Sequence, residues 1–162
     1  MALITYAIIA GVLIGVDQLS KFLIVANLKV GESIPVWSGV FEIKRAPNNK
    51  GIAWSLFEDL PPWVFVVLSV VILTAIVVAV IKIKLPKPTW VRIAASMIVA
   101  GGLGNVIDRV MYGAVVDFLY VKLIDFPIFN FADCCVCVGA FILIFYVIFI
   151  YREPAIEKGA DK

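Results

Sequence analysis

Of the 162 residues of the chain, 63% are hydrophobic and 16% are charged, whereas a soluble domain is about 45 to 50% apolar and about 25% charged. Most of the chain is therefore expected to lie in a membrane. A net charge of +2 without a long basic run argues against nucleic-acid binding, and the lack of histidine excludes Ser-His-Asp and Cys-His catalysis.

Four apolar runs are long enough to cross a bilayer, which requires about 20 residues. They cover residues 4–25, 63–81, 91–110 and 134–151. The first run has no basic start and is interrupted by charged residues, so we interpret it as a retained helix and not as a cleaved signal peptide. The sequence thus predicts an all-α membrane protein with four transmembrane helices in a single polytopic domain, residues 1–162.

The loop between the second and third runs carries four basic residues and no acidic one: Lys82, Lys84, Lys87 and Arg92. Positive charge in a short loop marks the cytoplasmic side, so four crossings would place both termini in the cytoplasm. The connection 27–61 then faces outward, and its alternating apolar and polar residues favour short strands. The aromatic-rich segment 111–132 is expected to lie along the outer membrane interface.

Placing an ionisable residue inside a membrane segment costs free energy, and in this chain such residues occur in clusters. Asp17 and Lys21 lie four residues apart on one helical face, which is also the pattern of a purely structural ion pair. Asn105, Asp108 and Arg109 follow i, i+3 and i+4 spacing and are expected to point the same way. Glycines beside them, such as Gly101, favour close packing of a neighbouring helix.

Two carboxylates stand in apolar surroundings at the same expected membrane level. Asp117 follows the third run and Asp133 precedes the fourth, with Asn130 three residues earlier. Each alone could cap a turn or a helix. Together, two close carboxylates cannot both ionise, and such a dyad can activate water without a metal. A proton-coupled transporter subunit, which would use the acids as a relay, and an assembly factor without chemistry remain alternatives.

Three cysteines follow Asp133 in the apolar run. The number of cysteines is odd, so they cannot all pair, and neighbours in a helix have poor geometry for a disulfide. The three are Cys134, Cys135 and Cys137. They are interpreted as small packing residues, with a reactive or metal-binding thiol as the alternative.

Five stretches carry a family pattern in chain order: DQLSK (17–21), NKGIAWSL (49–56), GGLGNVIDRV (101–110), VVDFL (115–119) and FPIFNFAD (126–133). With four membrane helices, this order resembles lipoprotein signal peptidase, the bacterial membrane aspartic protease family also called signal peptidase II. The resemblance implies that Asp117 and Asp133 are the catalytic aspartates. It implies no cofactor and no metal.

The same resemblance assigns supporting roles to other residues. Asn105 and Arg109 would contact substrate near the dyad, Asp108 would fix Arg109, and Asn130 would stand beside Asp133. The resemblance also assigns Asn49 and Gly51 to an extracytoplasmic β-cradle over the substrate, in the connection 27–61, and Asp17 and Lys21 to a pair near the membrane surface. Ile52 departs from the family pattern, which usually has alanine there.

The implied reaction is hydrolysis of the peptide bond just before a diacylglyceryl-modified cysteine in a prolipoprotein, releasing the signal peptide. The implied partners are that substrate and membrane lipids. The resemblance further implies a monomer in the bacterial inner membrane with its active site near the extracytoplasmic face.

Overall fold

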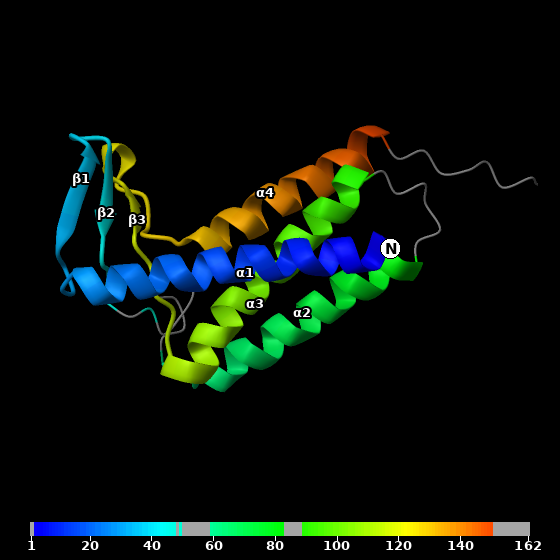
Figure 1. The fold of residues 1–162 in the computed structure, drawn as a ribbon, viewed down its shortest axis with the longest axis horizontal. Coiled ribbons are helices and arrows are strands. Elements are labelled where there is room, and N and C mark those ends of the chain that lie inside the picture. The colour runs from blue at the N-terminus through cyan, green and yellow to red at the C-terminus, as the bar shows by residue number, and fades with distance from the viewer. Residues whose placement is uncertain (1, 48, 50–58, 83–88, 151–162) are drawn as a thin grey trace, which may run out of the picture.

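Long helices dominate the structure, a computed structural model that describes residues 2–47, 49, 59–82 and 89–150. The helices are α1 (Ala2–Asn27), α2 (Pro62–Lys82), α3 (Thr89–Tyr112) and α4 (Phe131–Phe145), and α4 continues as a π-helical turn, η3 (Tyr146–Ile150). Helix α3 is central, because it packs against α1, α2 and α4. Figure 1 shows α3 crossing behind α1, with α2 and α4 on opposite sides.

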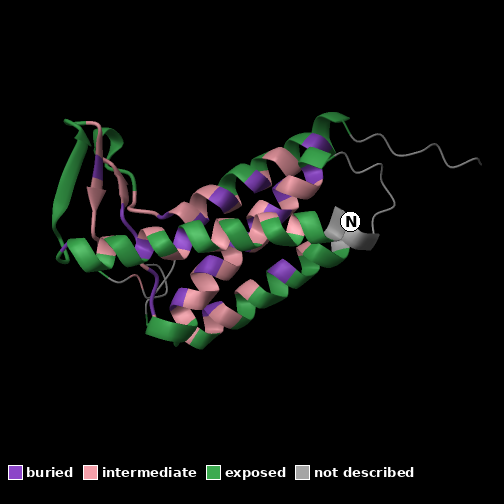
Figure 2. Cartoon of the chain, in the orientation of Figure 1, coloured by how far each residue is buried: buried purple, intermediate pink, exposed green. Residues whose placement is uncertain are grey.

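Three of these helical segments are long and apolar enough to cross a membrane: Ile4–Asn27, Thr89–Tyr112 and Phe131–Ile150. The apolar stretch of α2 whose side chains are described, Pro62–Val78, is shorter than this, so the described residues do not confirm a fourth span. Large apolar side chains cover the outer helix surfaces, for example Val12 on α1 and Phe141 on α4, 61% and 69% exposed. Figure 2 shows these exposed faces in green. Such surfaces suit contact with lipid.

A three-stranded antiparallel sheet lies at the end of the helices opposite the N-terminus (Figure 1). Strands β1 (Ser33–Trp37) and β2 (Phe41–Lys44) belong to the connection in which short strands were predicted. The third strand, β3 (Leu119–Val121), pairs with β2 and comes from the segment predicted to be interfacial. Residues 119–121 form a strand by pairing with the edge of β2 that β1 leaves open.

The helices approach one another closely where small residues stand. A Cβ atom on Gly101 of α3 would overlap the backbone carbonyl of Ala132 in α4. A Cβ atom on Gly139 of α4 would lie 2.6 Å from the carbonyl oxygen of Ala94 in α3. The prediction that the glycines of the third helix permit close packing is confirmed.

The start of α4 lies further upstream than the sequence predicted. Asn130 is its N-cap, and the helix begins at Phe131, three residues before the predicted start at residue 134. Asp133 therefore lies in the first turn and is not the capping residue. The tail, and most of the basic loop used to predict orientation, fall outside the described residues.

Candidate active site

Asp117 is held in an extended segment between the end of α3 and β3. Its backbone carbonyl accepts from the N–H of Ala46 at 3.1 Å, and the N–H of the next residue, Phe118, donates to the Phe129 carbonyl at 2.9 Å. The residue is only 4% exposed. Backbone contacts on both sides thus fix where this carboxylate can point.

Asn49 supplies one partner of that carboxylate. Its backbone exchanges hydrogen bonds with Val115 at 3.0 and 2.8 Å, and its side-chain Nδ2 donates to Asp117 Oδ2 at 3.0 Å. The stretch 49–56 therefore contributes to the site through Asn49. Gly51 and Ile52 of the same stretch lie outside the described residues.

Asp133 is fixed by the cap of α4. The Asn130 side-chain oxygen accepts from the backbone N–H of Asp133 at 3.0 Å, and Asp133 Oδ2 accepts from the backbone N–H of Asn130 at 3.0 Å. This reciprocal pair is a capping box. The cap sets the direction of the Asp133 side chain and also stabilises the start of the helix.

Two amides connect the two carboxylates. Asn130 Nδ2 donates to Asp117 Oδ1 at 2.7 Å and to Asn105 Oδ1 at 3.1 Å. Asn105 Nδ2 in turn donates to Asp133 Oδ1 at 2.8 Å. Asp117 and Asp133 are thus linked through a continuous hydrogen-bonded path, with Asn130 fully buried between them.

The electrostatics of Asp117 follow from this setting. Burial raises the pKa of its carboxyl above the usual range, and the hydrogen bond from Asn49 acts in the opposite direction. The nearby Asp133 charge raises this pKa further, while the Asn130 hydrogen bond lowers it. A carboxyl that tends to hold a proton beside a second carboxylate is the arrangement that divides acid and base roles.

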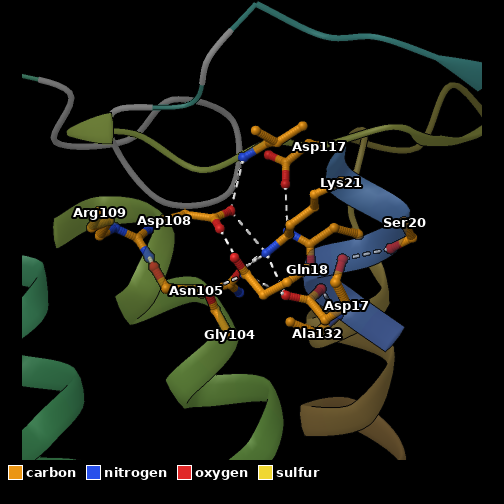
Figure 3. Close-up of polar contacts among 12 residues, drawn as sticks. Asp17, Gln18, Ser20, Lys21, Gly104, Asn105, Asp108, Arg109, Asp117 and Ala132 are labelled. Carbon is orange, nitrogen blue, oxygen red and sulfur yellow. Dashed lines mark hydrogen bonds and ion pairs between the residues drawn. The ribbon is translucent and has the colours of Figure 1, made fainter. Parts of the chain in front are cut away.

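A buried ionic cluster of Asp17, Lys21 and Asp108 contacts Asn105 (Figure 3). Lys21 Nζ contacts Asp17 Oδ2 at 2.9 Å and Asp108 Oδ2 at 2.8 Å, and it donates to Asn105 Oδ1 at 3.0 Å. Asp17 Oδ1 accepts from the backbone N–H of Ala132 in the first turn of α4 at 3.0 Å. The Asp17–Lys21 pair therefore joins α1 to both α3 and α4.

Asp108 and Arg109 do not share one environment, contrary to the prediction that they point the same way. The Asp108 carboxylate accepts from Lys21, from Gln18 Nε2 at 2.9 Å and from the backbone N–H of Val116 at 3.2 Å. The Arg109 guanidinium lies over the ring of Phe65 in α2, 5.4 Å from its centroid. Consecutive helical residues are about 100° apart, so α3 turns them toward different neighbours.

A cavity of about 830 Å³ opens beside the dyad. Asp117, Asp133, Asn105, Arg109 and Asn49 supply most of its polar lining, and its apolar lining comes from α2, α3, α4 and the connection between α3 and α4, chiefly residues 126–129. Along α4 the lining extends from Asp133 to Ala140, about two helical turns. Cys134 and Cys137 belong to this wall, whereas Cys135 is buried. The site thus combines paired acids with a long apolar groove.

Gln18 is a site residue that the sequence analysis did not single out. Its Nε2 contacts Asp17 Oδ2 at 3.1 Å, the Gly104 carbonyl at 3.2 Å and Asp108 Oδ1 at 2.9 Å. One signal for this role is present in the sequence, the position of Gln18 between Asp17 and Lys21. A single glutamine in a helix does not by itself indicate a site.

Comparison with known proteins agrees with this geometry. The family model described as "Signal peptidase (SPase) II" matches residues 9–149. The chain belongs to the signal peptidase II family. It is therefore a membrane aspartic peptidase, and the transporter alternative has no support from the comparisons.

Relatives of this signal peptidase II chain match along most of their length. The lipoprotein signal peptidase of Brevibacillus brevis is 40% identical over 139 residues, 86% of this chain and 91% of that protein. That of Enterococcus faecalis is 38% identical over 159 residues, 98% of this chain and 96% of that protein. A solved structure described as a bacterial membrane enzyme studied by the in meso method at 2.3 Å is similar with a TM-score of 0.80 and 33% identity, covering 97% of this chain and 94% of that one.

Proposed function

We propose that this peptidase removes the signal peptide from prolipoproteins by cutting just before a diacylglyceryl-modified cysteine, with Asp117 and Asp133 as its catalytic pair. The observation that carries the proposal is the hydrogen-bonded path through Asn130 and Asn105 that joins the two carboxylates at the wall of the apolar cavity. The relatives are named lipoprotein signal peptidases, which supports this substrate class.

Hydrolysis needs one acid and one base. In the proposed reaction, the ionised carboxylate of the pair takes a proton from water while the protonated carboxyl gives its proton to the carbonyl oxygen of the scissile amide. The water oxygen bonds to the carbonyl carbon. The carboxyl that took the water proton then gives it to the departing nitrogen, while the other carboxylate takes a proton from a hydroxyl of the tetrahedral species. The C–N bond breaks, and the pair again holds one protonated and one ionised carboxyl. The two titrations belong to the pair and not to either residue alone.

The cavity suits a substrate that is apolar on both sides of the cut. A signal peptide forms an apolar helix, and the modified cysteine carries two acyl chains. The lining from α2 and α4 offers an apolar wall on either side of the central helix. The polar residues Asn49, Asn105 and Arg109 would orient the peptide at the reacting carbonyl.

The proposed placement in the membrane rests on the basic loop between the second and third apolar runs and on the apolar helix faces. Helix α2 also crosses the membrane, which makes four crossings in total, and both termini are cytoplasmic. The sheet, together with Asp117 and Asn130, faces the extracytoplasmic side of the bacterial inner membrane. The chain forms one polytopic domain with its β-cradle at about 27–61, and it works as a monomer. The exposed apolar faces of α1 and α4 support contact with lipid.

The test uses purified enzyme with one prolipoprotein in two forms, carrying or lacking the diacylglyceryl group on its cysteine. Mass spectrometry of the products should show cleavage immediately before the cysteine of the lipidated form and little cleavage of the other form. Equal cleavage of both forms, or a cut at another bond, would contradict the proposal.

A further inference from the structure

The ammonium group of Lys21 has one contact that an ion pair alone does not explain. Besides Asp17 and Asp108, its Nζ donates to Asn105 Oδ1 at 3.0 Å, and the residue is only 3% exposed. Asn105 is the residue whose Nδ2 reaches Asp133 Oδ1 at 2.8 Å. One amide therefore connects a buried cation on α1 to a carboxylate of the dyad.

An asparagine amide has two chemically different ends, an acceptor oxygen and a donor nitrogen. Lys21 has only donors, so it can pair with Asn105 only through the oxygen. Asn130 Nδ2, also a donor, approaches the same oxygen at 3.1 Å. With the oxygen held on that side, the NH₂ group faces Asp133. The reversed amide would place donor against donor at Lys21 and oxygen against carboxylate at Asp133.

We propose that Lys21 is a positioning residue for the reaction, which fixes the orientation of the Asn105 amide so that its NH₂ group donates to Asp133. This inference rests on the proposed function of the site. Lys21 itself is absent from the lining of the main cavity, and it lines a separate cavity of about 180 Å³ with Gln18 and Asp108. It acts on the dyad through Asn105.

The position of Lys21 is itself determined by its two carboxylate partners. Asp17 Oδ2 and Asp108 Oδ2 hold its Nζ at 2.9 and 2.8 Å, from α1 and α3 respectively. Gln18 Nε2 contacts both carboxylates. A buried ammonium with this many partners has little freedom, so the donor that Asn105 meets is kept in one place.

The Lys21 charge has a second, separable effect. Its field lowers the pKa of Asp117. The charged groups around it are Asp17 on α1, Asp108 and Arg109 on α3, Asp133 on α4, Asp117 before β3, and Arg45, which shares the smaller cavity. Removing the cation alone should therefore move the pH profile of cleavage to higher pH.

Two variants separate orientation from charge. Lys21→Met removes the donor and the charge. Lys21→Met with Asp108→Asn removes the same donor together with one carboxylate, so the net charge of the Asp17–Lys21–Asp108 cluster stays the same. Lys29→Gln, which changes an exposed lysine two residues beyond α1, is the matched control.

Cleavage of a lipidated prolipoprotein is measured across pH for each purified protein, with thermal unfolding to count folded enzyme. Wild type and Lys29→Gln should cleave alike; no cleavage by wild type would contradict the proposed function instead. Both Lys21 variants should lose about tenfold to a hundredfold in kcat per folded molecule with little change in KM. Only the single variant should show the pH profile moved to higher pH.

Near wild-type kcat in the double variant would overturn the inference and leave Lys21 a role in charge balance alone. Unchanged kcat per folded molecule in Lys21→Met would do the same. Failure of both variants to fold would assign Lys21 to folding and would also overturn it.

Discussion

Asn130 donates its side-chain Nδ2 to Asp117 Oδ1 at 2.7 Å while its own oxygen caps the backbone N–H of Asp133 at 3.0 Å. One fully buried amide thereby ties the segment before β3 to the first turn of α4. The separation of the two carboxylates is set by this residue and by Asn105. The dyad depends on the amides between its members as much as on the acids.

Asn130→Ala should therefore lose both activity and stability. The lost helix cap alone costs about 1 kcal/mol, and the loss of a fixed donor beside the dyad should lower kcat about a hundredfold. Cleavage kinetics and thermal unfolding in detergent measure the two effects. Asn27→Ala, which removes an exposed hydrogen bond at the end of α1, is the control and should behave like wild type. Full activity of Asn130→Ala would contradict the bridging role.

Gly101→Ala should destabilise the protein, because the added methyl group would overlap the Ala132 carbonyl, one residue before Asp133. Overpacking of this kind typically costs about 1 to 3 kcal/mol. Gly15→Ala is a matched control in another helix, where a Cβ atom meets nothing within 4 Å. Thermal unfolding should show a lower Tm for the first variant only. Equal Tm values for the two variants would contradict the close contact between α3 and α4.

Asp117→Asn should change how stability depends on pH. Burial raises the Asp117 pKa in the folded state, so the folded protein binds more protons than the unfolded chain as pH rises from about 4 toward neutrality. The wild type therefore loses stability through that window, and the variant lacks this loss. The free energy of unfolding of the variant, relative to wild type, should increase with pH.

Unfolding measured at several pH values checks this slope. Asp125→Asn, at an exposed position near the sheet, controls for the exchange of Asp for Asn. A stability difference that stays flat, or that falls with rising pH, would contradict a raised Asp117 pKa.

Cys134→Ala combined with Cys137→Ala should keep cleavage within a few-fold of wild type, because the proposed chemistry uses no thiol. Both side chains line the cavity beside Asp133, however, so a bulky maleimide should inhibit wild type by occupying the groove and should spare the double variant. EDTA should have no effect on either protein. Loss of activity in the double variant itself would implicate the thiols in the chemistry.

The sequence predicted which polar residues come together at the cavity better than it predicted how they are arranged. Asp117 and Asp133 could be found because a carboxylate in an apolar frame is costly, and their proximity could be inferred from two helix ends at one membrane level. The division of Asp108 and Arg109 between two environments could not be inferred. Each is spaced to lie near Asn105 on α3, but the two are about 100° apart around the helix, so that Asp108 meets α1 and Arg109 meets α2.

Other features lacked a local signal altogether. Strand β3 has only three residues, and its partner β2 lies some 75 positions earlier, so no periodic pattern marks it. Gln18 gains its role only when α1 packs against α3. Asp133 was considered as a possible cap of the fourth helix because the apolar run starts after it, although Phe131 and Ala132 already extend the helix upstream.

The catalytic pair is tested most directly by the cleavage rate of a lipidated prolipoprotein under single-turnover conditions, with purified Asp117→Asn and Asp133→Asn beside Asp125→Asn. The account predicts that each dyad variant folds but loses cleavage by at least about a thousandfold, since each lacks either the acid or the base, while Asp125→Asn cleaves like wild type. Cleavage by either dyad variant at near the wild-type rate would contradict it.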